Sequence, residues 1–329
     1  MLANWLFART QIYPKLEPSL SCMGRMRPLF HPIIDVNQRL FAARSLLLAL
    51  CSRADLEAVR AQAARIGLML EEPGSTPTSR FLALDAVAYS LWLSGAFEQA
   101  NSVLRESNRT AKEHELSLND PLHHQARQLL AFSISDPPET LESILALQRA
   151  IHPGCHYGMS MLRCALAQQA MLRGESSAAL NPAVWAVARA DSASAADAQL
   201  ITRLALSTAL ALEGDHAKAT RVLREAEALL ERDPRELARR DLELVASYLA
   251  LRRSDRSECQ RLLVRSLNAS PVASQAFARF PRQMAELCIE ALRSGIAVRA
   301  VHELIIQYRL RPGANLGDRW PGPSRVSFR

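Results

Sequence analysis

The sequence has few aromatic residues and no paired cysteines. Phe, Trp and Tyr make up only 5% of the 329 residues, although 49% of the residues are hydrophobic. A core built mainly from Leu, Ala and Val is typical of packed helices and not of β-sandwiches. The six cysteines are scattered without a CxxC pair, and a chain of this length does not need disulfides for stability. We therefore expect an all-α protein with reduced, buried thiols.

The sequence also lacks a long apolar run. No stretch is long enough to span a bilayer, and Arg9 and Lys15 interrupt the apolar N-terminus, which therefore lacks the core of a secretory signal. These two absences predict a cytoplasmic protein.

Motifs that carry catalysis or bind cofactors are absent as well. The sequence contains no GxxxxGK[ST] loop to hold phosphates and no GxSxG turn to present a nucleophile. Acidic residues such as Glu225, Glu227 and Glu231 are interpreted as the solvated face of a helix with partners one turn away. We expect no enzymatic activity and no cofactor.

One loop contains side chains of the types that bind metal ions. His152, Cys155 and His156 lie close together, with Cys164 following on a predicted helix, and such soft ligands can hold zinc. The spacing matches no zinc-finger pattern and a second cysteine pair is absent, so exposed histidines and a buried Cys155 are the preferred interpretation. The pair His123 and His124 is interpreted in the same way, as a helix start. No metal site is predicted.

The positive charge is concentrated at the two ends of the chain. The net charge is +7, but residues 30–292 contain 29 basic and 30 acidic residues. A repeat protein whose groove followed a phosphate backbone would be basic along its length, because each phosphate contact needs a cation. We therefore expect no sequence-specific binding of nucleic acid by this chain alone.

What the sequence does contain is a repeat of about 40 residues. A small residue followed by a helix start recurs at spacings of 40, 39, 40, 40 and 41 residues, namely at Gly95, Ser135, Gly174, Gly214, Ser254 and Gly295. Five positions after each of them stands another small residue: Ala100, Thr140, Ala179, Ala219, Cys259 and Ala300. Gly or Ser can end one helix in a tight turn, and a small residue on the next helix lets the two axes approach closely.

Each period therefore predicts one helical hairpin. We expect an α-solenoid over residues 38–310 with about six to seven hairpins, after an irregular segment 1–37 and before a linker 311–329. A weaker first hairpin would turn at Ala54 and Asp55, and Pro182 must kink its helix or start a new segment. Each hairpin should contact only its neighbours, which predicts an elongated molecule.

The unit resembles the tetratricopeptide repeat. That family has a Leu-small pair seven residues before a Gly-Asp-aromatic turn, and this chain has Leu166-Ala167 before Gly174, Leu206-Ser207 before Gly214 and Leu287-Cys288 before Gly295. The resemblance covers roughly residues 80–310. It departs from the family in its longer period, in Gln128 at a small-residue position and in Pro182.

The C-terminal part has a second, narrower resemblance. Residues 287–311, followed by the linker residues Trp320 and Pro321, resemble the end of the sensor array in MalT-like bacterial transcription regulators. In that family the linker leads to a DNA-binding winged helix and an ATPase module lies upstream. The sequence contains neither module, and Gly322 replaces an expected second tryptophan of the linker.

Two hypotheses follow for function. The first is a non-catalytic sensing or docking segment of a MalT-like regulator, which binds a protein, a peptide or a small-molecule inducer. The second is a free-standing tetratricopeptide adaptor with no role in transcription. First helices would line a concave binding face. Trp92 and Trp185 are interpreted as packing residues, and the sequence does not identify the residues that contact a ligand.

Overall fold

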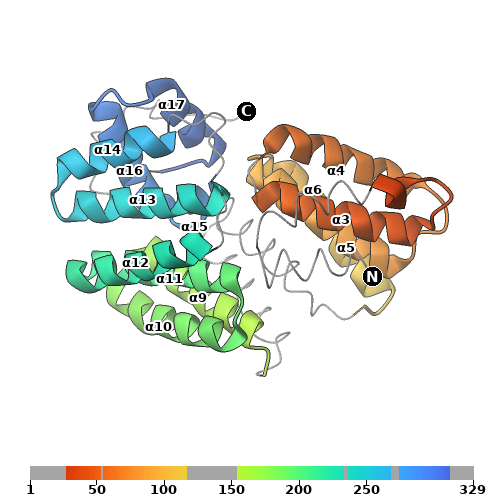
Figure 1. The fold of residues 1–329 in the computed structure, drawn as a ribbon, viewed down its shortest axis with the longest axis horizontal. Coiled ribbons are helices and arrows are strands. Elements are labelled where there is room, and N and C mark those ends of the chain that lie inside the picture. Colours follow the sequence, from red (N-terminus) through yellow and green to blue (C-terminus); the bar gives the residue numbers. More distant parts are fainter. Residues whose placement is uncertain (1–26, 53–54, 117–153, 233–235, 268–273, 312–329) are drawn as a thin grey trace.

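The described residues form only helices, turns and bends. The computed structural model describes residues 27–52, 55–116, 154–232, 236–267 and 274–311. After a short 3-10 helix, Arg27–Phe30, come α3 (Val36–Ser52), α4 (Leu56–Glu71), α5 (Pro77–Leu93), α6 (Phe97–Glu113), α9 (His156–Arg173), α10 (Ser176–Ala193), α11 (Ala196–Leu212), α12 (His216–Arg232), α13 (Glu236–Arg252), α14 (Arg256–Leu267), α15 (Ala276–Arg279), α16 (Pro281–Arg293) and α17 (Val298–Gln307). They stack as helical hairpins (Figure 1), and the prediction of an all-α array of hairpins is confirmed.

Left-handed residues end the first helix of several hairpins, where the repeat pattern has its small residue. Gly95, Gly174, Gly214 and Gly295 have φ between 66° and 84°, a region that glycine adopts at little cost. At the equivalent position Ser254 also has a positive φ, of 62°. The turns are therefore encoded locally, by a residue that tolerates the left-handed conformation.

The 40-residue register is regular through three consecutive hairpins. The first helices α9, α11 and α13 begin at residues 156, 196 and 236, and the second helices α10, α12 and α14 begin at 176, 216 and 256. Residues 40 positions apart therefore occupy equivalent places in these hairpins. The small residues Ala100, Ala179, Ala219 and Cys259 are completely buried, whereas Ala300 is only partly buried.

First and second helices bury different amounts of surface. Consecutive first helices pack on one another, α9 on α11 and α11 on α13, and α11 is buried along most of its length. On α12 the buried residues recur every three or four positions, at Ala219, Val222, Ala226 and Leu230. A helix with one apolar stripe covers a core from outside, while a helix that is apolar on all sides lies within it. The first helices therefore form the inner layer.

The next first helix is broken in two. By register it would begin at residue 276 and run without interruption, but α15 ends at Arg279 and α16 begins at Pro281. The residue before a proline avoids the helical conformation, because its backbone clashes with the proline ring. Phe280 accordingly has φ −133° and ψ 53°. The break separates the first turn of the helix from the rest.

The two ends of the array meet. Tyr308, which follows α17, lies between Phe97 of α6 and Phe277 of α15, with ring centroids 5.8 and 5.3 Å away. The turn between α5 and α6 also approaches α17, since a Cβ on Gly95 would lie 2.3 Å from Cγ of Gln307. Aromatic rings at these separations pack favourably.

Polar contacts join the same elements. Gln275 donates a hydrogen bond to the hydroxyl of Tyr89 on α5, and Arg309 forms an ion pair with Glu98 on α6. These partners are 186 and 211 residues apart in the sequence. The prediction that each hairpin contacts only its neighbours is therefore wrong, because the break at Phe280 and the residues around Tyr308 bring distant hairpins into contact.

Other local predictions can be compared with the structure. α10 continues through Pro182 as one helix, so this proline does not start a new segment. Asp55 caps α4 by accepting a hydrogen bond from the backbone N–H of Ala58 at 3.1 Å. Within the described residues, no helix combines the length and apolarity needed to cross a membrane.

Candidate binding surfaces

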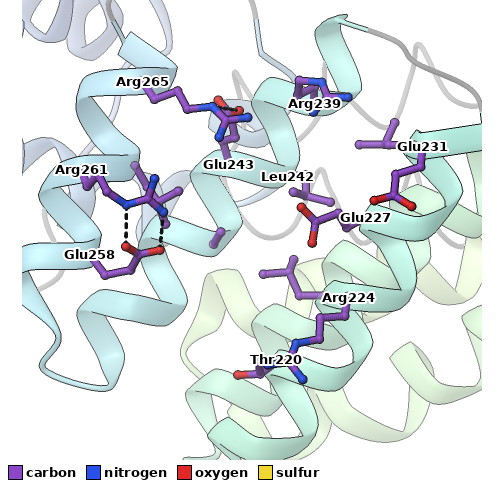
Figure 2. Close-up of a pocket in the computed structure, with 14 residues that line it drawn as sticks. Thr220, Arg224, Glu227, Glu231, Arg239, Leu242, Glu243, Glu258, Arg261 and Arg265 are labelled. Carbon is purple, nitrogen blue, oxygen red and sulfur yellow. Dashed lines mark hydrogen bonds and ion pairs between the residues drawn. The ribbon is translucent and has the colours of Figure 1, made fainter.

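A groove lies between the second helices α12 and α14, with α13 as its floor (Figure 2). Its volume is about 250 Å³. The apolar part of its lining consists of Leu242 and Ala246 of α13, Leu223 and Leu230 of α12, and Leu262 of α14. The charged part consists of four arginines and four glutamates, Arg224, Arg239, Arg261, Arg265, Glu227, Glu231, Glu243 and Glu258. An apolar floor between charged walls is the usual arrangement of a binding groove.

The groove has a smaller side chain on α13 than the preceding hairpin has at the equivalent place. Ala246 on its floor is the register equivalent of Leu206, 40 residues earlier, which is buried in the preceding hairpin. The change from Leu to Ala removes three carbon atoms from the floor. On the α12 wall, the charged residues Arg224 and Glu227 occupy the places that Val184 and Val187 have on α10.

The charges on the α14 side of the groove neutralise one another. Arg261 pairs with Glu258 through two contacts of 2.7 Å, and Arg265 contacts Glu243 of α13 at 2.6 Å. Burial raises the pKa of Glu243, although the neighbouring Arg265 and Arg239 favour its charged form. The α14 wall therefore has little net charge to offer a ligand.

The α12 side differs. Arg224, Glu227 and Glu231 line the groove, and they form no ion pair or side-chain hydrogen bond within the described part of the chain. Arg239 of α13 also lines the groove, where it favours the charged form of Glu243. These four side chains leave two cations and two anions along one wall. The wall is suited to a ligand that carries both signs of charge.

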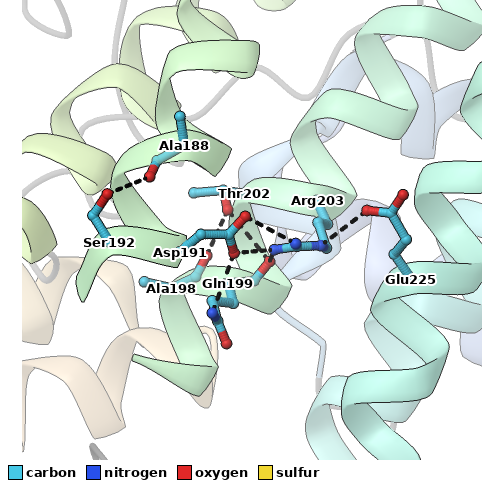
Figure 3. A network of polar contacts seen from close by, with 8 residues as sticks. All are labelled: Ala188, Asp191, Ser192, Ala198, Gln199, Thr202, Arg203 and Glu225. Carbon is cyan, nitrogen blue, oxygen red and sulfur yellow. Dashed lines mark hydrogen bonds and ion pairs between the residues drawn. The ribbon is translucent and has the colours of Figure 1, made fainter. Parts of the chain in front are cut away.

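In the preceding hairpin a bridging arginine occupies the corresponding region (Figure 3). Arg203 on α11 binds both carboxylate oxygens of Asp191 on α10, at 2.9 and 3.1 Å, and contacts Glu225 on α12 at 3.4 Å. Gln199 donates to the same Asp191 at 3.1 Å. The expectation that Glu225 has its partner on its own helix is therefore wrong, because the register places it beside the first helix.

Trp185 lies on the surface of the hairpin α9–α10. It is 54% exposed, whereas Trp92 is 1% exposed in the core. The guanidinium carbons of Arg163 and Arg189 both lie 5.9 Å from the centroid of the Trp185 ring, and Arg189 also contacts Nδ1 of His156 at 3.2 Å. The interpretation of Trp92 as a packing residue is confirmed, and that of Trp185 is wrong because its helix face is turned outward.

A buried polar cluster occupies the junction where the ends of the array meet. Asp241 of α13 accepts hydrogen bonds from Ser274 Oγ at 2.5 Å and from the Ala276 backbone N–H at 3.1 Å. The buried guanidinium of Arg279 donates twice to Gln275 Oε1, at 2.7 and 2.9 Å. Burial raises the pKa of Asp241 to about 6, although these hydrogen bonds and Arg279 oppose the shift. Residues 274–279 of the chain therefore occupy the space beside α13 at this junction.

The described candidates for the metal site, Cys155, His156 and Cys164, do not belong to any cluster of three potential ligands among the described residues. Cys155 is exposed at the start of α9, where its sulfur accepts a contact from the Gly158 N–H, while Cys164 is buried in the core. The expectation of a buried Cys155 is therefore wrong. Over the described ranges, no group of three potential ligands forms. His152, the pair His123 and His124, Ser135 with Thr140, and the linker residues Trp320 and Pro321 lie outside the described residues.

The small residues that recur every 40 positions, such as Gly214 and Ala219, do not line the groove. The groove residues were not identified from the sequence. The sequence nevertheless contained a signal. When the hairpins are aligned at their 40-residue register, Ala246 is equivalent to Leu206, and Trp185 is equivalent to Glu225. Comparison of one hairpin with the next therefore indicates where the outer surface changes.

The fold is similar to that of a protein of known structure. A crystal structure of a Rap protein complexed with competence and sporulation factor superposes with a TM-score of 0.55 at 9% sequence identity, over 83% of this chain and 78% of that chain. No family model matches the sequence, and no curated protein matches it. The chain thus has a tetratricopeptide-type fold of stacked helical hairpins like that of a Rap protein.

Proposed function

We propose that the chain is a non-catalytic repeat module that binds a peptide or a peptide-like segment of a partner protein in the groove between α12 and α14. The observation that carries this proposal is the groove itself, whose apolar floor includes the small side chain of Ala246. Apolar side chains of the ligand would lie on the floor, and its charged groups would pair with the α12 wall, which holds both signs of charge.

The state of the cysteines supports a non-catalytic role. Burial raises the pKa of Cys164 to about 11 and that of Cys259 and Cys288 to about 12, and it raises the pKa of Cys51 still further. A cysteine nucleophile needs its thiolate, and these thiols are protonated at neutral pH. The four buried cysteines are therefore packing residues.

The similar fold adds support of a limited kind. The Rap protein of similar fold was crystallised with competence and sporulation factor, so this arrangement of hairpins is compatible with the binding of a factor. At 9% identity the likeness concerns the fold, and the ligand of one protein does not identify that of the other.

Closing the groove tests the proposal. Ala246→Leu places in the groove floor the residue that the preceding hairpin carries at Leu206, so it should fill the space without disturbing the fold. Peptides selected on the unmodified protein from a random display library should bind Ala246→Leu about tenfold or more weakly, as expected for the loss of a buried apolar contact.

The matched control is Leu206→Ala, which makes the reverse change one hairpin earlier and should leave binding of the selected peptides unchanged. Circular dichroism would show that both variants keep their helical content. If the selection yields no peptide, or if selected peptides bind Ala246→Leu as tightly as the unmodified protein, the groove is not the binding site.

The narrower hypothesis of a MalT-like sensing segment remains a proposal about the same module. It rests on residues 287–311 and on the linker at Trp320 and Pro321, and the comparisons add no support for it. The alternative of a free-standing adaptor makes the same prediction for the groove. Both require a bound partner, and they differ in whether the module belongs to a transcription regulator or acts as an adaptor unrelated to transcription.

A further inference from the structure

The outer surface carries one pair of positions that recurs in three consecutive hairpins. The pair joins a residue of the first helix to the residue 22 positions later on the second helix. In α11–α12 it is Arg203 with Glu225, an ion pair of 3.4 Å. In α13–α14 it is Glu243 with Arg265, an ion pair of 2.6 Å with the charges exchanged. At this position a charge on the first helix is therefore neutralised by its own hairpin.

The hairpin α9–α10 breaks this pattern. Its equivalent residues are Arg163 and Trp185, so the arginine of the first helix faces an indole ring at 5.9 Å instead of a carboxylate. Arg189, one turn further along α10, approaches the same ring at 5.9 Å. Within the described ranges no carboxylate lies within ion-pair distance of Arg163 or Arg189. This hairpin thus presents two guanidinium groups and an exposed ring.

The chemistry of this surface favours a protein partner. Trp and Arg are the residue types that contribute most to the binding energy of protein interfaces. Each guanidinium can bind a carboxylate through two parallel hydrogen bonds while the indole face covers apolar surface of the partner. The contact between Arg189 and His156 holds Arg189 beside the ring, so the surface is formed before the partner arrives.

A carboxylate is favoured over a phosphate for two reasons. The equivalent arginine of the next hairpin, Arg203, already binds two carboxylates, those of Asp191 and Glu225. In addition, residues 30–292 contain 29 basic and 30 acidic residues, so the positive charge at Trp185 is local. A nucleic-acid surface would need cations spread along the array.

We propose that Arg163, Trp185 and Arg189 form a docking surface for an acidic segment of a partner protein. Glu or Asp side chains of that segment pair with the guanidinium groups of Arg163 and Arg189 beside the indole, and an apolar neighbour packs on the exposed Trp185 ring. This surface lies on α9 and α10 and shares no residue with the groove between α12 and α14. It therefore adds a second contact to the proposed function and can be tested separately.

The test replaces the missing carboxylate within the chain. Trp185→Glu recreates the ion pair found one hairpin later, so the fold should be kept. The new carboxylate would neutralise the charge of Arg163 within its own hairpin. The probe is a short fluorescein-labelled peptide of glutamate, leucine and serine, measured by fluorescence anisotropy with the full chain. We expect Trp185→Glu and Arg163→Gln each to weaken binding about tenfold or more, as for a charged hydrogen-bonded contact.

Three controls make the result specific. Arg221→Gln removes the same charge from an exposed position of α12, and Ala246→Leu fills the separate groove; both should bind the probe within about twofold of the unmodified protein, as distant surface substitutions do. A third control is the same peptide with glutamine in place of glutamate, which should bind about tenfold or more weakly.

The proposal is overturned if the unmodified protein does not bind the glutamate peptide or binds the glutamine peptide equally well. It is also overturned if Arg221→Gln weakens binding as much as Trp185→Glu, since the effect would then be one of net charge. A labelled oligothymidylate that binds more tightly than the peptide and loses binding in Trp185→Glu would assign the surface to nucleic acid.

Discussion

Replacement of Asp241 by Asn should change how the stability of the protein depends on pH. Asp241 is buried, and its pKa is raised from 3.8 to about 6 because burial disfavours its charge. The folded state therefore binds a proton more tightly than the unfolded state. Stability contributed by this group is fully present below pH 4, is lost as the pH rises from about 4 to about 6, and stays lost above.

The size of the effect follows from the shift. Each pKa unit corresponds to about 1.4 kcal/mol, so a shift of about two units disfavours the folded state by about 3 kcal/mol at pH 8 relative to a neutral group. Asn keeps an oxygen that can accept from Ser274 Oγ and from the Ala276 N–H, and it carries no charge. Its amide group also needs an acceptor, so we expect Asp241→Asn to be about 1 to 3 kcal/mol more stable than the unmodified protein at pH 8.

Urea denaturation followed by circular dichroism between pH 4 and pH 8 measures this difference. The stability of the variant relative to the unmodified protein should fall by about 3 kcal/mol as the pH falls from 8 to 4, because the buried carboxyl of Asp241 becomes neutral. Burial also raises the pKa of Glu243 and Glu286, but both proteins retain these groups, so their effect cancels in the comparison. If the variant is less stable at pH 8, the hydrogen bonds and Arg279 hold Asp241 in its charged form, and the argument from burial is refuted.

Three further predictions concern packing, turns and nucleic acid. Ala219→Phe should lower the melting temperature far more than Lys218→Phe, because Ala219 is fully buried where two helices cross and overpacking costs about 1 to 3 kcal/mol; the reverse order in thermal melts would refute the register. Gly174→Ala should destabilise the protein more than Gly214→Ala. Both positions have a positive φ, which costs an alanine about 1 to 2 kcal/mol, but only at Gly174 would the new Cβ lie 2.3 Å from Arg282 Nη1. Equal urea midpoints would show that the Arg282 side chain moves away freely. Labelled duplexes of different sequence should bind equally weakly at physiological salt, and nanomolar binding of one sequence would show that the repeats read bases.

The sequence alone determined the helical hairpins and their register. Gly174 and Gly214 end first helices because only a residue that tolerates positive φ fits these turns, and this requirement is local. The small residues Ala179 and Ala219, five positions later, are buried because the crossing of two helices depends on the same short stretch of chain. Period and side-chain size therefore predict the elements and how each pair packs.

The outer surfaces could be predicted only in part. The sequence shows that Ala246 stands where the preceding hairpin has Leu206, but whether the missing volume becomes a groove depends on how closely α12 and α14 approach each other. Trp185 was assigned to the core because large aromatic residues are usually buried. The structure turns its helix face outward, and pairing across two helices decides which residue lies beside Arg163.

Only the tertiary structure decided that the array closes on itself. Pro281 signals a break in the helix, but not where the separated turn goes. Its position depends on the fit of Gln275 to Tyr89, of Phe277 to Tyr308 and of Ser274 to Asp241. A repeat period describes contacts between neighbours, whereas contacts between residues 186 or more positions apart depend on the summed curvature of all the hairpins between them.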